Sequence, residues 1–400
     1  MTQQKILVKV KPEIMKWAID SSGWEIEELA KKLKVTDAAI NNWKTRNQEI
    51  EIRKLEKLSE FVKRPLAIFF LENPPKESEL TDYRKLPHEQ AVKLTRNTVN
   101  AIRNARYLQS SAEELMKIQG INPKPTINIK ITMQTLPEEA ARTERKKIGF
   151  ESEDVLLSKE AKRSIRDFYN VLRRTIESFN IFVFQVSMPI EEVRGVTLSD
   201  KFPRVIVINS KDTIQARIFS LLHEYGHVLL RKDGICIPQA IYEKNYSNGN
   251  FQHIEKWCNS FAASVLMPKE EFLAEYHNLE EKETETRKII DILSNKFRTS
   301  KQATVIRIKD LEKKSNISYE YQNILGEIRK DEIIRDRTKK KSSGGPGIVN
   351  TCISQKGRKF VLLVLESKRN KVINNSDVID YLNINLKHLK KLQEKAFRIV

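Results

Sequence analysis

A short run of residues around two histidines constrains this chain more than any other feature. In Ile218–Leu230, His223 and His227 lie four residues apart, and Glu224 stands between them. Side chains at positions i and i+4 share one face of an α-helix, so both imidazoles can reach one metal ion. Glu224 is placed to accept a proton from water at that ion. The stretch therefore predicts a metal site with a base beside it.

The flanking residues favour a helix through this stretch. Apolar residues recur at helical spacing, and Asp212 is predicted to be the N-cap. The recurring residues are Ile214, Ile218, Leu221, Leu222, Tyr225, Val228 and Leu229. HExxH on a helix is the arrangement found in zinc-dependent peptidases, where the glutamate is the general base.

Two histidines leave a tetrahedral zinc site in need of a third protein ligand. Glu255 begins a second predicted helix, Ile254–Leu266, which Pro268 ends. The number of residues between His227 and Glu255 is compatible with a second helix that packs antiparallel to the first. Cys258 follows on the same helix face, so its thiolate is an alternative ligand, although a small buried side chain is the simpler interpretation. His253 points off that face.

Composition favours a multidomain protein with an anionic partner. A chain of 400 residues suggests two or three domains, and the net charge of +19 suggests a polyanion or an acidic protein surface as partner. From Lys296 onward there are 25 Lys and Arg against 11 Asp and Glu, so about +14 of that charge lies in the last quarter. Three scattered cysteines, the lack of a long apolar run and the lack of a signal peptide predict a cytoplasmic protein with no membrane partner.

Residues 1–75 predict a small all-helical unit that contains a helix-turn-helix. The second helix spans Ile26–Lys34, Val35 fills the turn, and Thr36 caps the third helix. Ile40 and Trp43 of the third helix are expected to face inward. A fourth helix follows with Leu55, Leu58 and Phe61 on its inner face.

This unit resembles the Cro/C1-type (XRE) helix-turn-helix domains, whose third helix enters the major groove. The resemblance implies a double-stranded DNA partner and assigns the contacts to the start and outer face of the third helix. These residues are Asp37, Ala38, Asn41 and Asn42 at the base edges, Lys44 and Arg46 at the phosphates, and Thr36 at the cap of the helix. Lys34 stands where the family usually has glycine, which favours the alternative of a helical protein-docking module.

The middle of the chain alternates between predicted helices and two strands. Helices are expected over 90–120, 138–150 and 156–179, after a linker that begins in Pro65–Pro75. The β-rich stretches Ile181–Val186 and Arg204–Asn209 predict strands. The second strand leads directly into the HExxH helix, as in thermolysin-like peptidases, and we assign it the role of the edge strand that pairs with substrate. Gly234–Gln252 is predicted to be a loop over the cleft.

The two histidine- and glutamate-bearing stretches resemble the ImmA/IrrE metallopeptidases over roughly residues 165–315. The matching residues are Asn209, Arg217, His223, Glu224, Gly226, His227, Glu255, Asn259, Phe261, Ala262, Leu266, Met267 and Pro268. The resemblance implies His223, His227 and Glu255 as metal ligands and Glu224 as the catalytic acid/base. It also implies Zn²⁺, with another divalent ion such as Mn²⁺ as an alternative. Cys258 replaces the alanine of the family.

The C-terminal part predicts further basic structure. Residues 287–311 resemble the end of the same family domain, in which Phe297–Ile308 looks like a second helix-turn-helix-like unit. In that family the unit is more often a packing element, although Arg298, Lys301 and Arg307 could touch phosphates. Thr338–Gly347 is a basic, glycine-rich break. After it, Lys359–Glu366 is predicted to be a buried strand and Ile373–Leu389 to hold a terminal helix.

The sequence therefore predicts an α+β, mostly helical chain with a thermolysin-like zincin core. The predicted divisions are a helix-turn-helix domain (1–75), a helical connector (76–164), a metallopeptidase domain (165–315) and a small basic α/β module (316–400). The predicted function is a DNA-binding transcriptional regulator with a zinc endopeptidase that cleaves a cytoplasmic regulatory protein. The alternatives are an antitoxin or repressor that binds DNA and a partner toxin with little turnover, and a purely structural zinc site. A homodimer is a further possibility.

Overall fold

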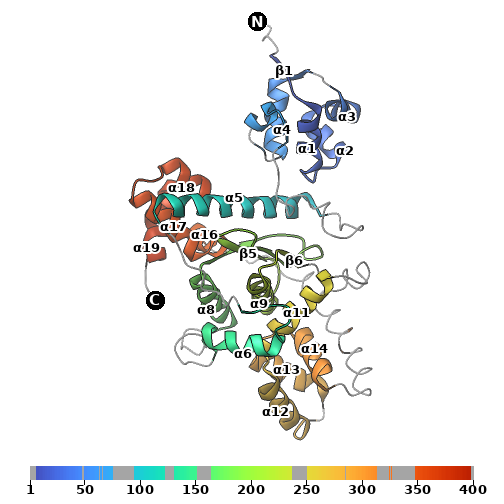
Figure 1. Ribbon diagram of the computed structural model, residues 1–400, viewed down its shortest axis with the longest axis vertical. Coiled ribbons are helices and arrows are strands. Elements are labelled where there is room, and N and C mark those ends of the chain that lie inside the picture. The colour runs from blue at the N-terminus through green and yellow to red at the C-terminus, as the bar shows by residue number, and fades with distance from the viewer. Residues whose placement is uncertain are drawn as a thin grey trace. The chain divides into compact units, whose positions relative to one another are not determined.

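The computed structural model of the protein (Figure 1) is an α+β, mostly helical chain. The structure describes residues 6–46, 49–62, 64, 66–74, 94–121, 130–150, 164–236, 250–283, 285–312, 324, 326 and 347–397. The chain divides into two compact units, Met1–Asn104 and Ala105–Val400. Among these residues no helix has the length and apolar character needed to cross a bilayer.

Most of the predicted cleft loop, Gly234–Gln252, lies outside the described ranges. Its two ends are the strand Gly234–Cys236 and the start of the helix Asn250–Leu266, so the loop prediction is wrong there, and Glu255 lies inside that helix rather than at its start. The linker that begins in Pro65–Pro75 continues into residues outside the described ranges, and only Gly347 of the predicted break Thr338–Gly347 is described.

The first unit combines short helices with a two-stranded sheet. Its described elements are β1 (Leu7–Lys9), α1 (Pro12–Asp20), α2 (Ile26–Leu33), α3 (Asp37–Thr45), β2 (Glu49–Glu51), α4 (Ile52–Val62), η1 (Leu66–Phe70) and the start of α5 (Arg96–Ile118). β1 and β2 pair antiparallel, so the prediction of an all-helical unit is wrong. Ile50 is buried between two glutamates, which is the alternation of a half-buried strand, but three residues are too few to recognise it.

The turn between α2 and α3 follows the sequence prediction. Thr36 caps α3, because its hydroxyl accepts a hydrogen bond from the Ala39 N–H at 3.2 Å. Ile40 and Trp43 are buried, as expected. Lys34 ends α2 with φ 55° and ψ 49°, the left-handed conformation that glycine adopts most easily. The lysine therefore occupies the position at some conformational cost.

The second unit is built around a mixed sheet with the strand order β3-β5-β4-β6. Its strands are β3 (Ile181–Val186), β4 (Gly195–Leu198), β5 (Arg204–Asn209) and β6 (Gly234–Cys236). β3 runs parallel to β5, whereas β4 is antiparallel to both β5 and β6. The predicted strands over 181–186 and 204–209 are confirmed. β4 is not predicted by the sequence, because its glycine is more typical of a loop. β5 lies inside the sheet, so its assignment as an edge strand is wrong.

Helices make up the other described elements of the second unit. They are the rest of α5, α6 (Pro137–Ile148), α8 (Ile165–Ser178), α9 (Ile214–Leu230), α11 (Asn250–Leu266), α12 (Lys269–Glu280), α13 (Thr286–Lys296), α14 (Lys301–Glu312), α16 (Ile348–Lys356), α17 (Arg358–Arg369), α18 (Asn375–Leu382), η3 (Leu386–His388) and α19 (Leu389–Phe397). Figure 1 shows α8 and α9 on one side of the sheet and α5 on the other.

Both faces of the sheet are covered by helices. Ile206 and Ile208 point into the core that contains α9, whereas Phe182 and Phe184 contact the ring of Phe360 on α17. Strands that are covered on both faces have continuous apolar sequences rather than alternating ones. This burial explains why β3 and β5 could be recognised from composition alone.

The C-terminal segment packs on the sheet as helices. The predicted strand over 359–366 is wrong, because these residues form α17. The described residues 347–397 contain helices only, which also corrects the predicted α/β character of this module. Arg173 of α8 donates to the Ser354 carbonyl at 2.6 Å, and Gln185 of β3 donates to the same carbonyl at 2.8 Å. Polar contacts therefore join α16 to α8 and to the sheet.

The predicted second helix-turn-helix-like unit is a packing element of the second unit. Arg307 of α14 is 5% exposed and donates to the Met267 carbonyl and to Glu138. Arg307 therefore cannot reach a phosphate, and these contacts agree with the packing role that the sequence favoured. Lys301 forms an ion pair with Asp291 at 2.5 Å, and the Arg298 guanidinium lies 4.4 Å from the ring centre of Phe168.

Candidate metal centre

Two packed helices carry the residues of the predicted metal site. α9 contains His223, Glu224 and His227, and α11 contains Glu255. Thr213 caps α9 through its side chain, which accepts from the Ala216 N–H at 3.2 Å. Asp212 is the cap that the sequence predicts, but its carboxylate accepts from the Thr213 N–H and pairs with Arg194. The helix therefore starts one residue later than predicted.

The three predicted ligands converge on one point. His223 Nε2 lies 3.2 Å from Glu255 Oε2, His227 Nε2 lies 3.0 Å from Glu255 Oε1, and the two Nε2 atoms are 3.2 Å apart. These residues form the one cluster of at least three potential metal ligands in the described part of the chain. Bonds of about 2.0–2.1 Å in a tetrahedron would separate ligand atoms by about 3.3–3.4 Å. The donor set and its spacing therefore fit a zinc-sized cation.

A neighbouring amide orients His223. Its Nδ1 lies 2.9 Å from Asn259 Oδ1, and a proton shared there leaves the Nε2 lone pair free to face the cluster. Asn259 comes from the same helix as Glu255, one turn further along. His227 Nδ1 has no hydrogen-bond partner among the described residues.

The cluster is nearly sealed from solvent and strongly polar. His223 is 1% exposed, His227 0% and Glu255 6%. Burial alone would raise the pKa of Glu255, but the two histidines hold it down at about 2. Burial would lower the pKa of His227, but Cys258 and Glu255 raise it well above its ordinary value. A metal ion needs the lone pairs of the two histidines, so protons and metal compete for these nitrogens.

Glu224 lies between α9 and the sheet. Its Oε2 accepts a hydrogen bond of 2.6 Å from the Thr197 hydroxyl on β4, and its Oε1 has no hydrogen-bond partner in the described structure. The side chain is 0% exposed, and this burial raises its pKa despite the two nearby histidines. A carboxyl group with a raised pKa is suited to exchanging protons.

Two glycines make room for these side chains. A Cβ at Gly195 would lie 2.4 Å from Glu224 Oε1, and a Cβ at Gly234 would lie 2.7 Å from Cε1 of His227. Neither contact could be recognised from sequence, since the residues are joined only by the fold. β4 and β6 thus approach the two site side chains with backbone alone.

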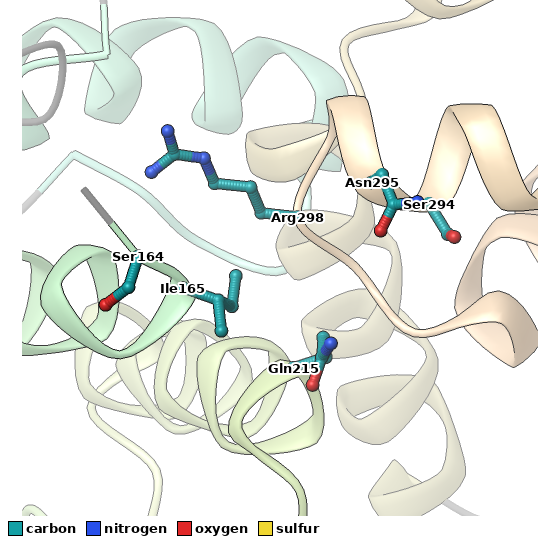
Figure 2. Close-up of a pocket in the computed structure, with 6 residues that line it drawn as sticks. All are labelled: Ser164, Ile165, Gln215, Ser294, Asn295 and Arg298. Atoms are coloured by element: carbon teal, nitrogen blue, oxygen red, sulfur yellow. The ribbon is translucent and has the colours of Figure 1, made fainter. Parts of the chain in front are cut away.

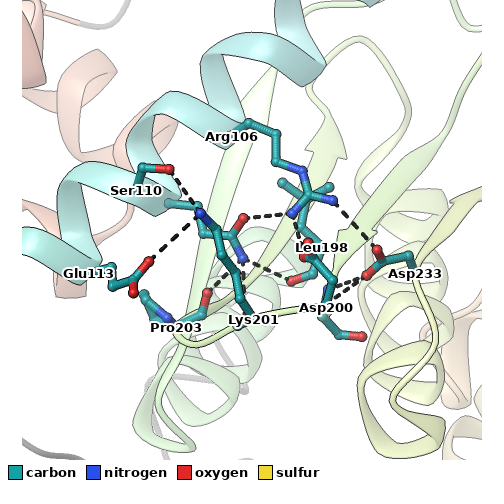
Figure 3. Close-up of polar contacts among 10 residues, drawn as sticks. Arg106, Ser110, Glu113, Leu198, Asp200, Lys201, Pro203 and Asp233 are labelled. Carbon is teal, nitrogen blue, oxygen red and sulfur yellow. Dashed lines mark hydrogen bonds and ion pairs between the residues drawn. The ribbon is translucent and has the colours of Figure 1, made fainter. Parts of the chain in front are cut away.

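Helix α5 fixes the strands that carry these glycines (Figure 3). Arg106 forms ion pairs with Asp200, which follows β4, and with Asp233, which precedes β6. Asp233 accepts the Ser199 and Asp200 N–H groups, at 2.5 and 3.0 Å. The ends of both strands are therefore tied to each other and to α5.

Other residues singled out in the sequence have structural positions. Cys258 is fully buried, and its Sγ would lie 3.2 Å from a Cβ at Gly226, so it fills the contact between α9 and α11. It does not belong to the cluster of potential ligands. Arg217 bonds to the carbonyls of Asp212 and Ser210 and to Gln185. His253 is exposed, as expected.

A separate pocket lies at the start of α8 (Figure 2). It has a volume of about 240 Å³ and is lined by Ser164, Ile165, Gln215, Ser294, Asn295 and Arg298. None of these residues belongs to the predicted metal site, so the histidine cluster remains the candidate site.

The residues predicted to contact DNA lie at the start and on the outer side of α3. Asp37, Ala38 and Asn41 are exposed, whereas Asn42 is half-buried. Lys44 pairs with Asp20 at 2.6 Å, so its ammonium group is already engaged. Arg46, just after α3, is exposed.

The side chains of the site are arranged in a way that is similar to zinc peptidases of the HExxH type, in which two histidines lie on one helix and a carboxylate stands beside them. Residues 176–309 match the family Peptidase_M78, described as the IrrE N-terminal-like domain. This part of the chain is therefore similar to a metallopeptidase family. No curated protein matches the chain.

Proposed function

We propose that this protein is a DNA-binding regulator with a metal-dependent endopeptidase site at His223, His227 and Glu255. The observation that carries the proposal is the buried Glu224 carboxylate beside the cluster. A purely structural zinc site prefers a closed shell of four protein ligands and has no use for a base. Here three protein ligands would leave a bound metal a position for water, and Glu224 is close enough to both histidines for them to lower its pKa.

The chain's own residues would handle the protons of peptide hydrolysis. A bound Zn²⁺ or Mn²⁺ would supply Lewis-acid polarisation and lower the pKa of water. Glu224 then accepts a proton as water attacks the peptide carbonyl, and donates it to the leaving amine. Asn259 keeps the His223 ring oriented, and Thr197 holds one oxygen of Glu224.

The substrate is proposed to be an extended segment of a cytoplasmic regulatory protein. β6 is the last strand of the sheet in the described structure, and its Gly234 lies against His227. An extended peptide can add to a sheet edge through main-chain hydrogen bonds. We therefore transfer the substrate-pairing role from β5 to the β6 edge.

A test of hydrolysis uses the full-length chain and an unfolded polypeptide as a general probe. We expect cleavage that stops when a chelator removes the metal and returns when Zn²⁺ or Mn²⁺ is added back. Binding to the chain's own promoter should survive chelation, because α2 and α3 lie in the other unit. Cleavage that is equal with and without metal would contradict the proposed site.

The same proposal includes DNA recognition by α3. The supporting observations are the capped start of α3 and the exposure of Asp37, Ala38 and Asn41. Replacing Asn41 and Asn42 with Ala should weaken binding to the cognate duplex by about 1–3 kcal/mol for each bidentate base pairing that is removed. Arg46→Ala should instead weaken all sequences alike and reduce the salt dependence.

These DNA variants are compared by titrating cognate and unrelated duplexes at several salt concentrations. Lys57→Ala on α4 is a matched control for loss of one exposed positive charge outside α3. A wild-type chain with no salt-dependent affinity for any duplex would contradict DNA binding and favour the protein-docking alternative.

A second candidate function is an antitoxin or repressor that binds DNA and a partner toxin with little peptidase turnover. The burial of the site favours it, since His223, Glu224 and His227 are each at most 1% exposed. A polypeptide needs direct access to these groups. Co-expression with a neighbouring toxin would distinguish the two, because protection without metal-dependent cleavage fits only the second candidate.

A further inference from the structure

We propose that Thr197 is a positioning residue for Glu224, which fixes one carboxylate oxygen so that the other exchanges the proton. This inference rests on the proposed hydrolytic function and extends it to the strand beside the site. Thr197 lies on β4, far from both ligand-bearing helices in sequence, and it belongs to neither motif.

The contact between the two side chains is short and directional. Thr197 Oγ1 lies 2.6 Å from Glu224 Oε2 and 3.1 Å from the Glu224 backbone carbonyl. A hydroxyl has one proton to donate, and hydrogen bonds from O–H to a carboxylate are typically about 2.5–2.7 Å long. The hydroxyl proton of Thr197 is therefore donated to Oε2, and Oε2 is the carboxylate oxygen that this hydrogen bond holds in place.

The second carboxylate oxygen is left for chemistry. Glu224 Oε1 is buried and has no hydrogen-bond partner among the described residues. Gly195 is two residues before Thr197, so it lies on the same face of β4. A Cβ there would be 2.4 Å from Oε1, 2.8 Å from Cδ and 2.9 Å from Cγ of Glu224. The glutamate is therefore held between a hydroxyl and a bare Cα.

β4, the strand that carries Gly195 and Thr197, is held by neighbouring strands on both sides. Thr197 is 0% exposed, and it pairs with Ile206 on β5 and with Gly234 on β6. A catalytic group held by a fixed neighbour reaches the reactive geometry without searching other rotamers. Thr197 would thus act on the rate of the proton transfer rather than on substrate affinity.

The test compares Thr197→Val, which removes the donor at nearly constant shape, with Thr197→Ser, which keeps it. We expect Thr197→Val to lower kcat about 10- to 100-fold, the effect of one hydrogen bond to a charged group, at unchanged KM. Thr197→Ser should restore kcat to within a few-fold of wild type. Metal content should stay at the wild-type level in both variants.

A matched control removes a buried threonine hydroxyl far from the site. Thr304 on α14 is also 0% exposed, and its hydroxyl bonds locally to Thr299 and to the Ser300 carbonyl. Thr304→Val therefore measures how much the melting temperature falls when a buried threonine hydroxyl is lost far from the site. A metal loss in Thr197→Val, or a drop in its melting temperature well beyond that of Thr304→Val, would assign Thr197 a structural role and overturn the inference.

Gly195→Ala gives a second route to the same question. Its new methyl group displaces the Glu224 carboxylate, so kcat should fall while metal content stays at the wild-type level. Glu224→Gln distinguishes a failure of the role proposed for Thr197 from a failure of the proposed hydrolytic function. If that variant is inactive while Thr197→Val matches wild type, only the role of Thr197 fails. If Glu224→Gln cleaves as fast as wild type, the proposed function itself fails.

Discussion

Glu224→Gln is expected to retain metal and to lose at least about 10²–10⁴-fold in hydrolysis, the usual loss for a general base. The amide keeps the shape of the side chain, and its oxygen can still accept the Thr197 hydroxyl. It cannot accept a proton from water at neutral pH. Glu224 is also absent from the three-residue ligand cluster, so the donor set stays complete.

The measurement combines metal analysis of the purified variant with initial rates on the same unfolded polypeptide used for wild type. DNA affinity should be unchanged, because the substitution lies in the second compact unit. Equal rates in the two proteins, with metal in both, would rule out the peptidase function. The remaining candidate would then be a DNA-binding regulator whose metal site does not catalyse hydrolysis.

The ligand-bearing helices were predictable because local spacing determines their geometry. His223 and His227 share a helix face wherever that helix packs, and Pro268 ends the second helix through its missing N–H. The structure brings Glu255 to them, as the sequence predicted from spacing and resemblance. Their role as metal ligands stays a prediction that metal analysis must decide.

The elements that surround the site could not be predicted, because tertiary packing decides them. Phe360 to Leu365 form a short apolar run, which periodicity alone cannot assign to strand or helix. In the structure this run lies in α17, which continues beyond it to Arg369, and most of its side chains are buried. Thr197 and Glu224 are 27 residues apart, so their contact exists only once β4 packs on α9.

The identity of the third ligand is tested by Glu255→Ala beside Cys258→Ala. Removal of Glu255 takes away a carboxylate that lies within 3.2 Å of both Nε2 atoms. Metal affinity should fall by more than the ~10–100-fold that loss of an outer-shell partner costs. Cys258→Ala should keep the metal, since its thiol lies outside the ligand cluster and packs against Gly226.

Metal content and metal-dependent stabilisation give two independent readouts of this pair. A cation that binds only the folded state raises the melting temperature as its concentration rises. Titration with Zn²⁺ should therefore raise the melting temperature of wild type and Cys258→Ala, but not of Glu255→Ala. Metal retained by Glu255→Ala and lost by Cys258→Ala would instead define a His₂Cys site, with Glu255 as a buried counter-ion.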